Sequence, residues 1–259
     1  MMLPKYKIVD THAHICDPSF DADRDEVLRN AVDAGIAAII AVGEDLSDAK
    51  RNIELAAMHP TLRPAAGLYP TILDLDQAEQ MRSFIRKERS KLVAIGEVGL
   101  DFWAVKEAPQ MELQIEILKT FISLSQELDL PLNIHSRSAG RHAVGLLLES
   151  GATRVQMHAF DGRASAALPA VEAGFFFSIP PSVVRSRQKQ KLVKHLPLSC
   201  LLVETDSPVL GPEPKERNEP ANITVSIKAI AELNNVSKDE VIESVAENTH
   251  RLYGNILTD

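Results

Sequence analysis

The strongest constraint on the fold of this 259-residue chain is a regular alternation of short apolar runs with longer amphipathic segments. In one such segment, QMELQIEILKTFISLSQELDL at residues 110–130, apolar residues recur at helical spacing. Eight apolar runs have the length and composition of buried strands, at 8–14, 37–42, 63–68, 92–96, 132–135, 154–158, 175–179 and 200–205. Strands that alternate with helices indicate a parallel sheet with helical crossovers. Eight such units in a chain of this length predict an α/β fold, the (β/α)8 TIM barrel.

A doubly wound open sheet is the alternative arrangement for alternating strands and helices. No glycine-rich dinucleotide-binding fingerprint follows the first apolar run, which weakens that alternative. No low-complexity segment and no linker rich in proline or glycine divides the chain. We therefore expect a single barrel domain that covers residues 1–259.

Metal-binding residue types gather at the predicted carboxyl ends of the apolar runs, where barrel enzymes carry their active sites. In VDTHAH, residues 9–14, both histidines would point to the same side of a strand. Four further runs lead into GEVGLDF, NIHSR, MHAF and VETDSP. A single histidine at a strand end is more often a hydrogen-bonded polar residue than a ligand, but recurrence on five runs favours a metal site. The candidate ligands are His12, His14, Glu97, His135, His158 and Asp206.

Six nitrogen and oxygen ligands exceed the needs of one tetrahedral ion and predict two divalent ions. Glu97 is the expected bridge between them, because its carboxylate has two oxygens. The first ion would also take ligands from the first and last runs, and the second ion would take the histidines of the fifth and sixth runs. A set without thiolates suits Zn²⁺, Mn²⁺ or Mg²⁺, and its histidine content favours Zn²⁺ or Mn²⁺.

The charge of the chain bears on its substrate. A formal net charge of −8 argues against loose binding of nucleic acid over the whole surface. Two divalent ions would nevertheless outweigh two carboxylate ligands and give the site a positive charge that suits phosphate. We expect Asp206 and Glu97 to be the catalytic residues, with Asp206 as general base toward a metal-bound water. Arg137 is the candidate for binding the phosphate, because a guanidinium can do so with two hydrogen bonds.

Other polar features lie near the predicted site. Glu204 shares a strand face with Asp206 but lies deeper, so we expect it to orient a ligand and not to bind metal. Asp101 and Asp161 are candidates either for orienting ligands or for contacting substrate. The basic segment RSRQKQKLVKH, residues 185–195, could line a path for nucleic acid, although such a run is more often the solvated face of a helix.

The motifs DTHAH, GEVGLDF, PLNIHSRSAG, MHAFDG, VETDSP and RNEP occur in this order and resemble those of the TatD-related metal-dependent deoxyribonucleases. The similarity extends over essentially the whole chain, and FFFSIPPSVVRSRQKQKLVKHLP resembles the third TatD-domain-containing branch known from animals. The resemblance implies a metal-dependent hydrolase barrel with exonuclease activity on DNA, from the 3′ end in well-known members. It assigns the family's metal positions to the six candidate ligands. Many relatives have HCFSG where this chain has HAFDG, so substrate preference stays open.

We therefore expect DNA as the substrate, no membrane association and no obligate protein partner. Cys16 and Cys200 are too few for a disulfide framework, and MMLPKYK at the amino terminus lacks the apolar stretch of a secretory signal. Both features predict an intracellular protein, cytoplasmic or nuclear. Two alternatives stay open: a hydrolase of the same fold that acts on a small phosphodiester, an amide or an ester, and a non-catalytic protein with a structural metal site.

Overall fold

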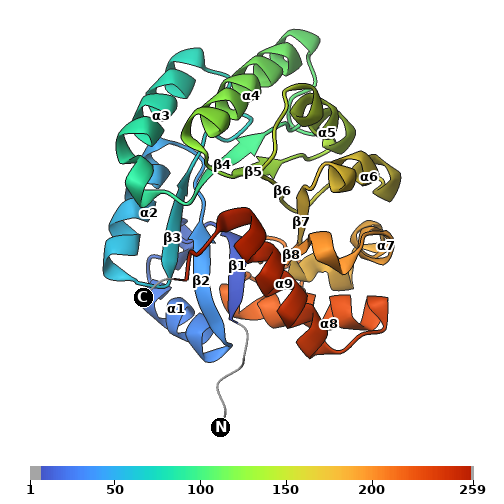
Figure 1. The fold of residues 1–259 in the computed structure, drawn as a ribbon. Helices are drawn as coiled ribbons and strands as arrows, with labels where there is room; N and C mark the ends of the chain where they lie inside the picture. Colours follow the sequence, from blue (N-terminus) through green and yellow to red (C-terminus); the bar gives the residue numbers. More distant parts are fainter. Residues whose placement is uncertain (1–6, 258–259) are drawn as a thin grey trace.

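Eight parallel strands form the centre of the computed structural model, which describes residues 7–257 (Figure 1). The strands are β1 (Ile8–Ala13), β2 (Ile36–Ala41), β3 (Leu62–Ala66), β4 (Ala94–Gly99), β5 (Leu132–His135), β6 (Val155–Met157), β7 (Phe176–Ile179) and β8 (Leu201–Val203). They lie in the sheet in the order of the sequence, and each pair from β1–β2 to β7–β8 is parallel. The predicted (β/α)8 TIM barrel is confirmed, since a doubly wound sheet would change strand order at a switch point.

Helices connect the strands and surround them (Figure 1). They are α1 (Arg24–Asp33), α2 (Leu46–Met58), α3 (Leu75–Glu88), α4 (Ala108–Leu128), α5 (Gly140–Glu149), α6 (Ala164–Glu172), α7 (Arg187–His195), α8 (Ile223–Asn234) and α9 (Lys238–Tyr253). Short 3-10 helices lie in the connections, at η1 (Pro18–Phe20), η2 (Arg89–Lys91), η3 (Pro181–Val184), η4 (Leu198–Cys200) and η5 (Pro220–Asn222). No helix within residues 7–257 combines the length and apolarity needed to cross a lipid bilayer.

Local sequence explains where several helices begin. The Asp45 carboxylate accepts hydrogen bonds from the backbone N–H groups of Ser47 and Asp48 and so caps α2. Ser237 and Glu240 form a capping box at the start of α9. These caps fix where α2 and α9 begin.

The two ends of the barrel differ in composition. At the amino-terminal end, small and branched residues of the strands pack against the last turn of α9 and the residues after it, which include Leu252, Tyr253 and Ile256. Figure 1 shows α9 crossing this end near β1 and β8. The carboxyl-terminal end carries buried His, Glu and Asp side chains instead. The polar end is therefore where the predicted site has to be sought.

The predicted runs overlap the observed strands, with one shift that matters for the site. β4 starts two residues later than the predicted run 92–96 and extends to Gly99, so Glu97 lies inside the strand and not after it. The late start follows from the preceding turn, where the Leu92 N–H donates to the Arg89 carbonyl and ends η2. The strand continues past Glu97 because Val98 and Gly99 pair with Ile134 and His135 of β5. The prediction of no secretory signal concerns a stretch that lies, except for Lys7, outside the described residues.

Candidate metal centre

Four side chains from β1, β4 and the turn after β8 meet at the carboxyl end of the barrel. We call the His12 Nε2, His14 Nε2, Glu97 Oε2 and Asp206 Oδ1 atoms the first ligand group. The two histidine nitrogens lie 3.3 Å apart. Each histidine nitrogen lies 3.3–3.7 Å from Glu97 Oε2 and from Asp206 Oδ1. Four atoms at tetrahedral positions around a zinc-sized ion are about 3.3–3.6 Å apart, so the five separations that involve His12 or His14 are close to those of one coordination sphere. His12, His14 and Glu97 together form a group whose ligand atoms could hold one metal ion.

Hydrogen bonds between β1 and the turn after β8 bring this group together. The Asp206 N–H donates to the His12 carbonyl at 2.9 Å, and the His14 N–H donates to the Ser207 carbonyl at 2.8 Å. Deeper in the barrel, the Asp10 carboxylate accepts hydrogen bonds from the N–H and hydroxyl of Thr205. Asp206 itself has a φ of 55°, in the left-handed region that non-glycine residues rarely adopt, which turns its carboxylate toward β1.

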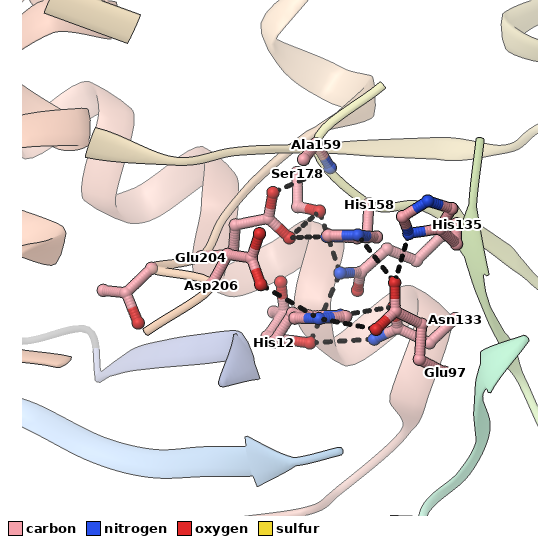
Figure 2. Close-up of polar contacts among 12 residues, drawn as sticks. His12, Glu97, Asn133, His135, His158, Ala159, Ser178, Glu204 and Asp206 are labelled. Carbon is pink, nitrogen blue, oxygen red and sulfur yellow. Dashed lines mark hydrogen bonds and ion pairs between the residues drawn. The ribbon is translucent and has the colours of Figure 1, made fainter. Parts of the chain in front are cut away.

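The second oxygen of Glu97 belongs to a second ligand group, with His135 Nδ1 and His158 Nε2. Glu97 Oε1 lies 2.5 Å from His135 Nδ1 and 3.0 Å from His158 Nε2. Figure 2 shows both contacts converging on the Glu97 carboxylate. The His158 ring also stacks on the His12 ring, with centroids 3.8 Å apart. The structure thus brings all six predicted ligands around one carboxylate.

Charges within the two ligand groups shift the pKa values of their members. Burial works against the charge of Glu97, but His158 and His135 hold the pKa of its carboxyl well below the usual range. Burial disfavours the charged forms of these histidines in turn, and Glu97 outweighs it and raises the pKa of both. The pKa of His14 rises to about 9, because its contacts with Glu97 also outweigh burial.

The hydrogen bonding of Glu97 gives independent support for a metal ion at this site. Glu97 is 1% exposed, and its Oε2 has ion-pair contacts with His14 Nε2 at 3.3 Å and His12 Nε2 at 3.7 Å but no hydrogen bond of good geometry from the described residues. A buried carboxylate oxygen without a well-directed donor is costly. A divalent cation among the first ligand group would satisfy this oxygen directly, and the donor set of imidazoles and carboxylates is one that such ions accept.

A further layer of side chains fixes the orientation of the histidines (Figure 2). His12 Nδ1–H donates to Asn133 Oδ1 at 2.8 Å, which leaves Nε2 free to act as a ligand. His135 Nε2–H donates to Asp101 at 3.2 Å. Glu204 lies 3.4 Å from His158 Nδ1 and accepts hydrogen bonds from Ser178 and from the Ala159 backbone N–H. Glu204 thus lies against His158, and Asp101 lies against His135.

The site opens into a cavity of about 510 Å³. Arg137 lines it, is exposed, and places its guanidinium 3.7 Å from the centre of the Trp103 ring. Asp161 also lines the cavity, and its carboxylate accepts a hydrogen bond from the Ser138 backbone N–H at 2.8 Å. Both residues therefore lie where a bound substrate would reach them.

Sequence reasoning missed four residues of this region: Glu44, Tyr69, Asn133 and Lys189. Asn133 precedes His135 by two residues on β5, so period-two alternation would have placed both inside the barrel. Lys189 precedes the buried Leu192 by three residues on α7, a spacing that puts it on the buried helix face. Glu44 and Tyr69 follow strands in loops, and no comparable periodicity marks them.

Glycine is required beside Glu97 because the neighbouring strands approach it closely. A Cβ at Gly96 would lie 2.6 Å from the Cβ of Asn133, well inside van der Waals contact. A Cβ at Gly67, just after β3, would collide with the backbone of Glu97. Both glycines let β4 lie close enough to its neighbours for Glu97 to reach both ligand groups.

Comparison with known proteins now identifies the family. The family model described as TatD related DNase matches residues 9–254. The human protein named Deoxyribonuclease TATDN3 is 45% identical over 95% of this chain and 94% of its own length. YabD of Bacillus subtilis, named an uncharacterized metal-dependent hydrolase, is 33% identical over 95% of this chain and 98% of its own length.

Solved structures agree with these sequence matches. The crystal structure of YjjV, a TatD homologue from Escherichia coli, has a TM-score of 0.88 and 28% identity, and covers 97% of this chain and 99% of its own. The fold, the family model and the curated relatives all extend over nearly the whole chain. The chain therefore belongs to the TatD-related DNase family.

Proposed function

We propose that this protein is a metal-dependent deoxyribonuclease, built as one barrel domain over residues 1–259, that hydrolyses phosphodiester bonds. Two divalent ions, Zn²⁺, Mn²⁺ or Mg²⁺, would be held by the six ligands with Glu97 between them. The observation that carries the proposal is in the first ligand group: His12 Nε2, His14 Nε2 and Glu97 Oε2 have separations close to those of ligands of one ion, and Glu97 Oε2 has no well-directed hydrogen bond among the described residues. Family membership and the name of the human relative support DNA as the substrate.

The side chains of the protein would divide the remaining work. A bound divalent ion would polarise the phosphodiester and favour ionisation of a water molecule. Burial works against the charge of Asp206, but His12 and the neighbouring histidines hold the pKa of its carboxyl below the usual value. Asp206 is therefore ionised at neutral pH and can accept a proton as general base. Arg137 offers a guanidinium at the cavity for the phosphate oxygens.

The openness of the site favours catalysis over a structural role for the metal. Structural sites enclose the ion fully, whereas catalytic sites leave a position for water or substrate. The side chain of His14 is 13% exposed, and members of both ligand groups line the cavity. This arrangement supports a reaction at the ions and argues against a metal that only stabilises the fold.

Two finer points complete the proposal. We propose that nucleotides are removed from the 3′ end, on the basis of the resemblance between the motifs of this chain and those of family members with that polarity. Cys16 and Cys200 are both free and buried, which supports the reducing intracellular compartment expected from the sequence.

The test is hydrolysis of single-stranded DNA labelled at the 3′ or the 5′ end, by metal-stripped protein to which Mg²⁺, Mn²⁺ or Zn²⁺ is added. The Asp206→Asn variant runs in parallel, since it keeps the shape of the side chain but removes the base. We expect metal-dependent cleavage that the variant loses, with the 3′ label released first. Folded, metal-loaded protein that cleaves no DNA with any of these ions would disprove the deoxyribonuclease assignment.

A further inference from the structure

Lys189 is a buried lysine in the wall of the active-site cavity. Its side chain extends from the first turn of α7 and is only 9% exposed, whereas Arg187, Lys191 and Lys194 of the same helix are exposed. His158 and Asp206 line the same cavity. The basic segment expected to be a solvated helix face therefore turns one of its cations inward.

The contacts of Lys189 leave its charge without a direct counterion. Its Nζ donates one hydrogen bond, to the carbonyl of Ala159 at 2.8 Å. Among residues 7–257, no carboxylate forms an ion pair with this ammonium, although Glu204, Asp161 and Asp206 are near enough to interact with its charge at longer range. A buried ammonium has three N–H groups, so the bond to Ala159 leaves donors that can face the cavity.

A lysine is costly at this position unless a ligand compensates it. Leu192 and Val193 lie three and four residues further along α7 and are buried, so the position belongs to the apolar face of the helix. An apolar side chain would pack there without the desolvation cost of a charge. An anion bound in the cavity would recover that cost, because hydrogen bonds to ionised partners are the strong ones.

We propose that the Lys189 ammonium binds phosphoryl oxygens of the substrate, so that the cavity holds phosphate between Arg137 on the β5 loop and Lys189 on α7. This inference rests on the proposed function for the identity of the substrate, but the anion site follows from the burial and contacts of Lys189 alone. The ligand class is a phosphate group, either inorganic phosphate or a phosphodiester.

A positioning role is the competing explanation for Lys189. Ala159 directly follows His158 and has a φ of 39°, in the left-handed region. The hydrogen bond from Lys189 could serve only to hold this turn and, through it, His158. A neutral donor would perform that role as well as a cation, so the two explanations predict different behaviour of a glutamine variant.

The test measures binding of inorganic phosphate to the metal-loaded protein by isothermal titration calorimetry. The variants are Lys189→Met, which removes charge and donor, and Lys189→Gln, which removes the charge but keeps an N–H donor. Lys194→Met is the matched control, because it removes the same charge from an exposed position of α7. Metal content and melting temperature are recorded for each protein, and hydrolysis of bis(p-nitrophenyl) phosphate is measured alongside.

We expect both Lys189 variants to bind phosphate at least about tenfold more weakly, while Lys194→Met binds it like the unchanged protein. If Lys189→Gln binds phosphate normally, or if both variants lose metal without a change in phosphate affinity, Lys189 is a positioning residue and the inference is wrong. Should Lys189→Met fail to fold, the glutamine variant decides.

The two proposals fail separately. Phosphate binding that depends on Lys189 in a protein that hydrolyses no phosphodiester would leave this inference standing and reject the proposed function. A protein that hydrolyses phosphodiesters but binds phosphate equally well with and without Lys189 would support the proposed function and reject this inference.

Discussion

The two ligand groups share Glu97 but differ in how closely the separations of their ligand atoms match those around a bound ion. In the first group, His12 Nε2 and His14 Nε2 lie 3.3–3.7 Å from each other, from Glu97 Oε2 and from Asp206 Oδ1, the spacing of ligands around a small cation. In the second, Glu97 Oε1 lies only 2.5 Å from His135 Nδ1, a hydrogen-bond distance that is too short for two ligands of one ion.

The difference lies in what satisfies each oxygen of Glu97. Oε1 is held by two imidazoles whose pKa values are raised, so protons occupy the place of a cation there. Oε2 has no well-directed hydrogen bond among the described residues, although His14, whose pKa is also raised, lies 3.3 Å from it. We therefore expect the first group to bind an ion after the loss of one proton, from His14, and with little rearrangement. The second should bind one only after both His135 and His158 lose protons and the His135 contact lengthens.

The largest effect should come from the residue that the two groups share. Glu97→Gln removes a negative charge from both, and losing several kcal/mol of transition-state stabilisation corresponds to roughly a 1000-fold fall in kcat/KM. The measurement is cleavage of labelled single-stranded DNA, together with the metal content by mass spectrometry. Glu44→Gln is the control, since Glu44 lines the same cavity but belongs to neither group. Equal losses in the two variants would contradict the bridging role.

The pH dependence of metal binding should separate the groups. The metal-free protein holds protons on His135, His158 and His14, whose pKa values are raised, and a metal must displace them. Affinity should therefore rise with pH, by about tenfold per pH unit for each proton displaced, and for the first group it should level off near the pKa of His14, about 9.

Calorimetric titrations between pH 6 and pH 8 check this prediction. The first group displaces the proton of His14 and should have a slope near one, whereas the second displaces protons from both His135 and His158, whose pKa values are raised, and should have a steeper slope. Two binding events with the same slope would contradict the distinction between the groups.

Substitution of a residue that contacts a ligand histidine should weaken metal binding at one ligand group at a time. Asn133→Ala removes the acceptor of His12 Nδ1–H, and Glu204→Gln removes the charge beside His158. Losing such a supporting partner costs about 10–100-fold in metal affinity. We expect Asn133→Ala to weaken the first ion and Glu204→Gln the second, in the same titrations. If both variants weaken the same binding event, the ligands are not divided as the distances indicate.

The smallest effect should come from the opposite end of the barrel. The Tyr253 hydroxyl donates to Gln156 at 2.5 Å, and Gln156 donates to Ser178, which donates to Glu204. Tyr253→Phe removes this hydrogen bond and a longer one, at 3.5 Å, that the hydroxyl accepts from Asn133, and should lower the free energy of unfolding by about 1–2 kcal/mol. Thermal unfolding should detect a fall of a few degrees. A large loss of metal affinity instead would show that this chain of bonds positions the second group.

The barrel could be predicted because its signal is local. Each strand reads as a short apolar run and each helix as a periodic segment, and parallel strands with short connections leave few topologies open. The ligand candidates followed from the same reading, since strand ends in a parallel barrel share one rim. The error at Glu97, placed after the strand instead of within it, arose because pairing of Val98 and Gly99 with β5 extends β4 past the apolar run, and this pairing is a tertiary contact.

The sequence by itself therefore determined the strand and helix alternation, and which residue types stand at the rim. Only the tertiary structure decided which atoms form each ligand group, because those contacts join distant parts of the chain: Asp10 and Thr205, which close the barrel beside the first group, are 195 residues apart. It also decided that Lys189 turns inward while its helical neighbours face solvent. Local periodicity fixes the face on which a side chain lies, but only the packing of α7 against its neighbours α6, α8 and η3 determines what that face meets.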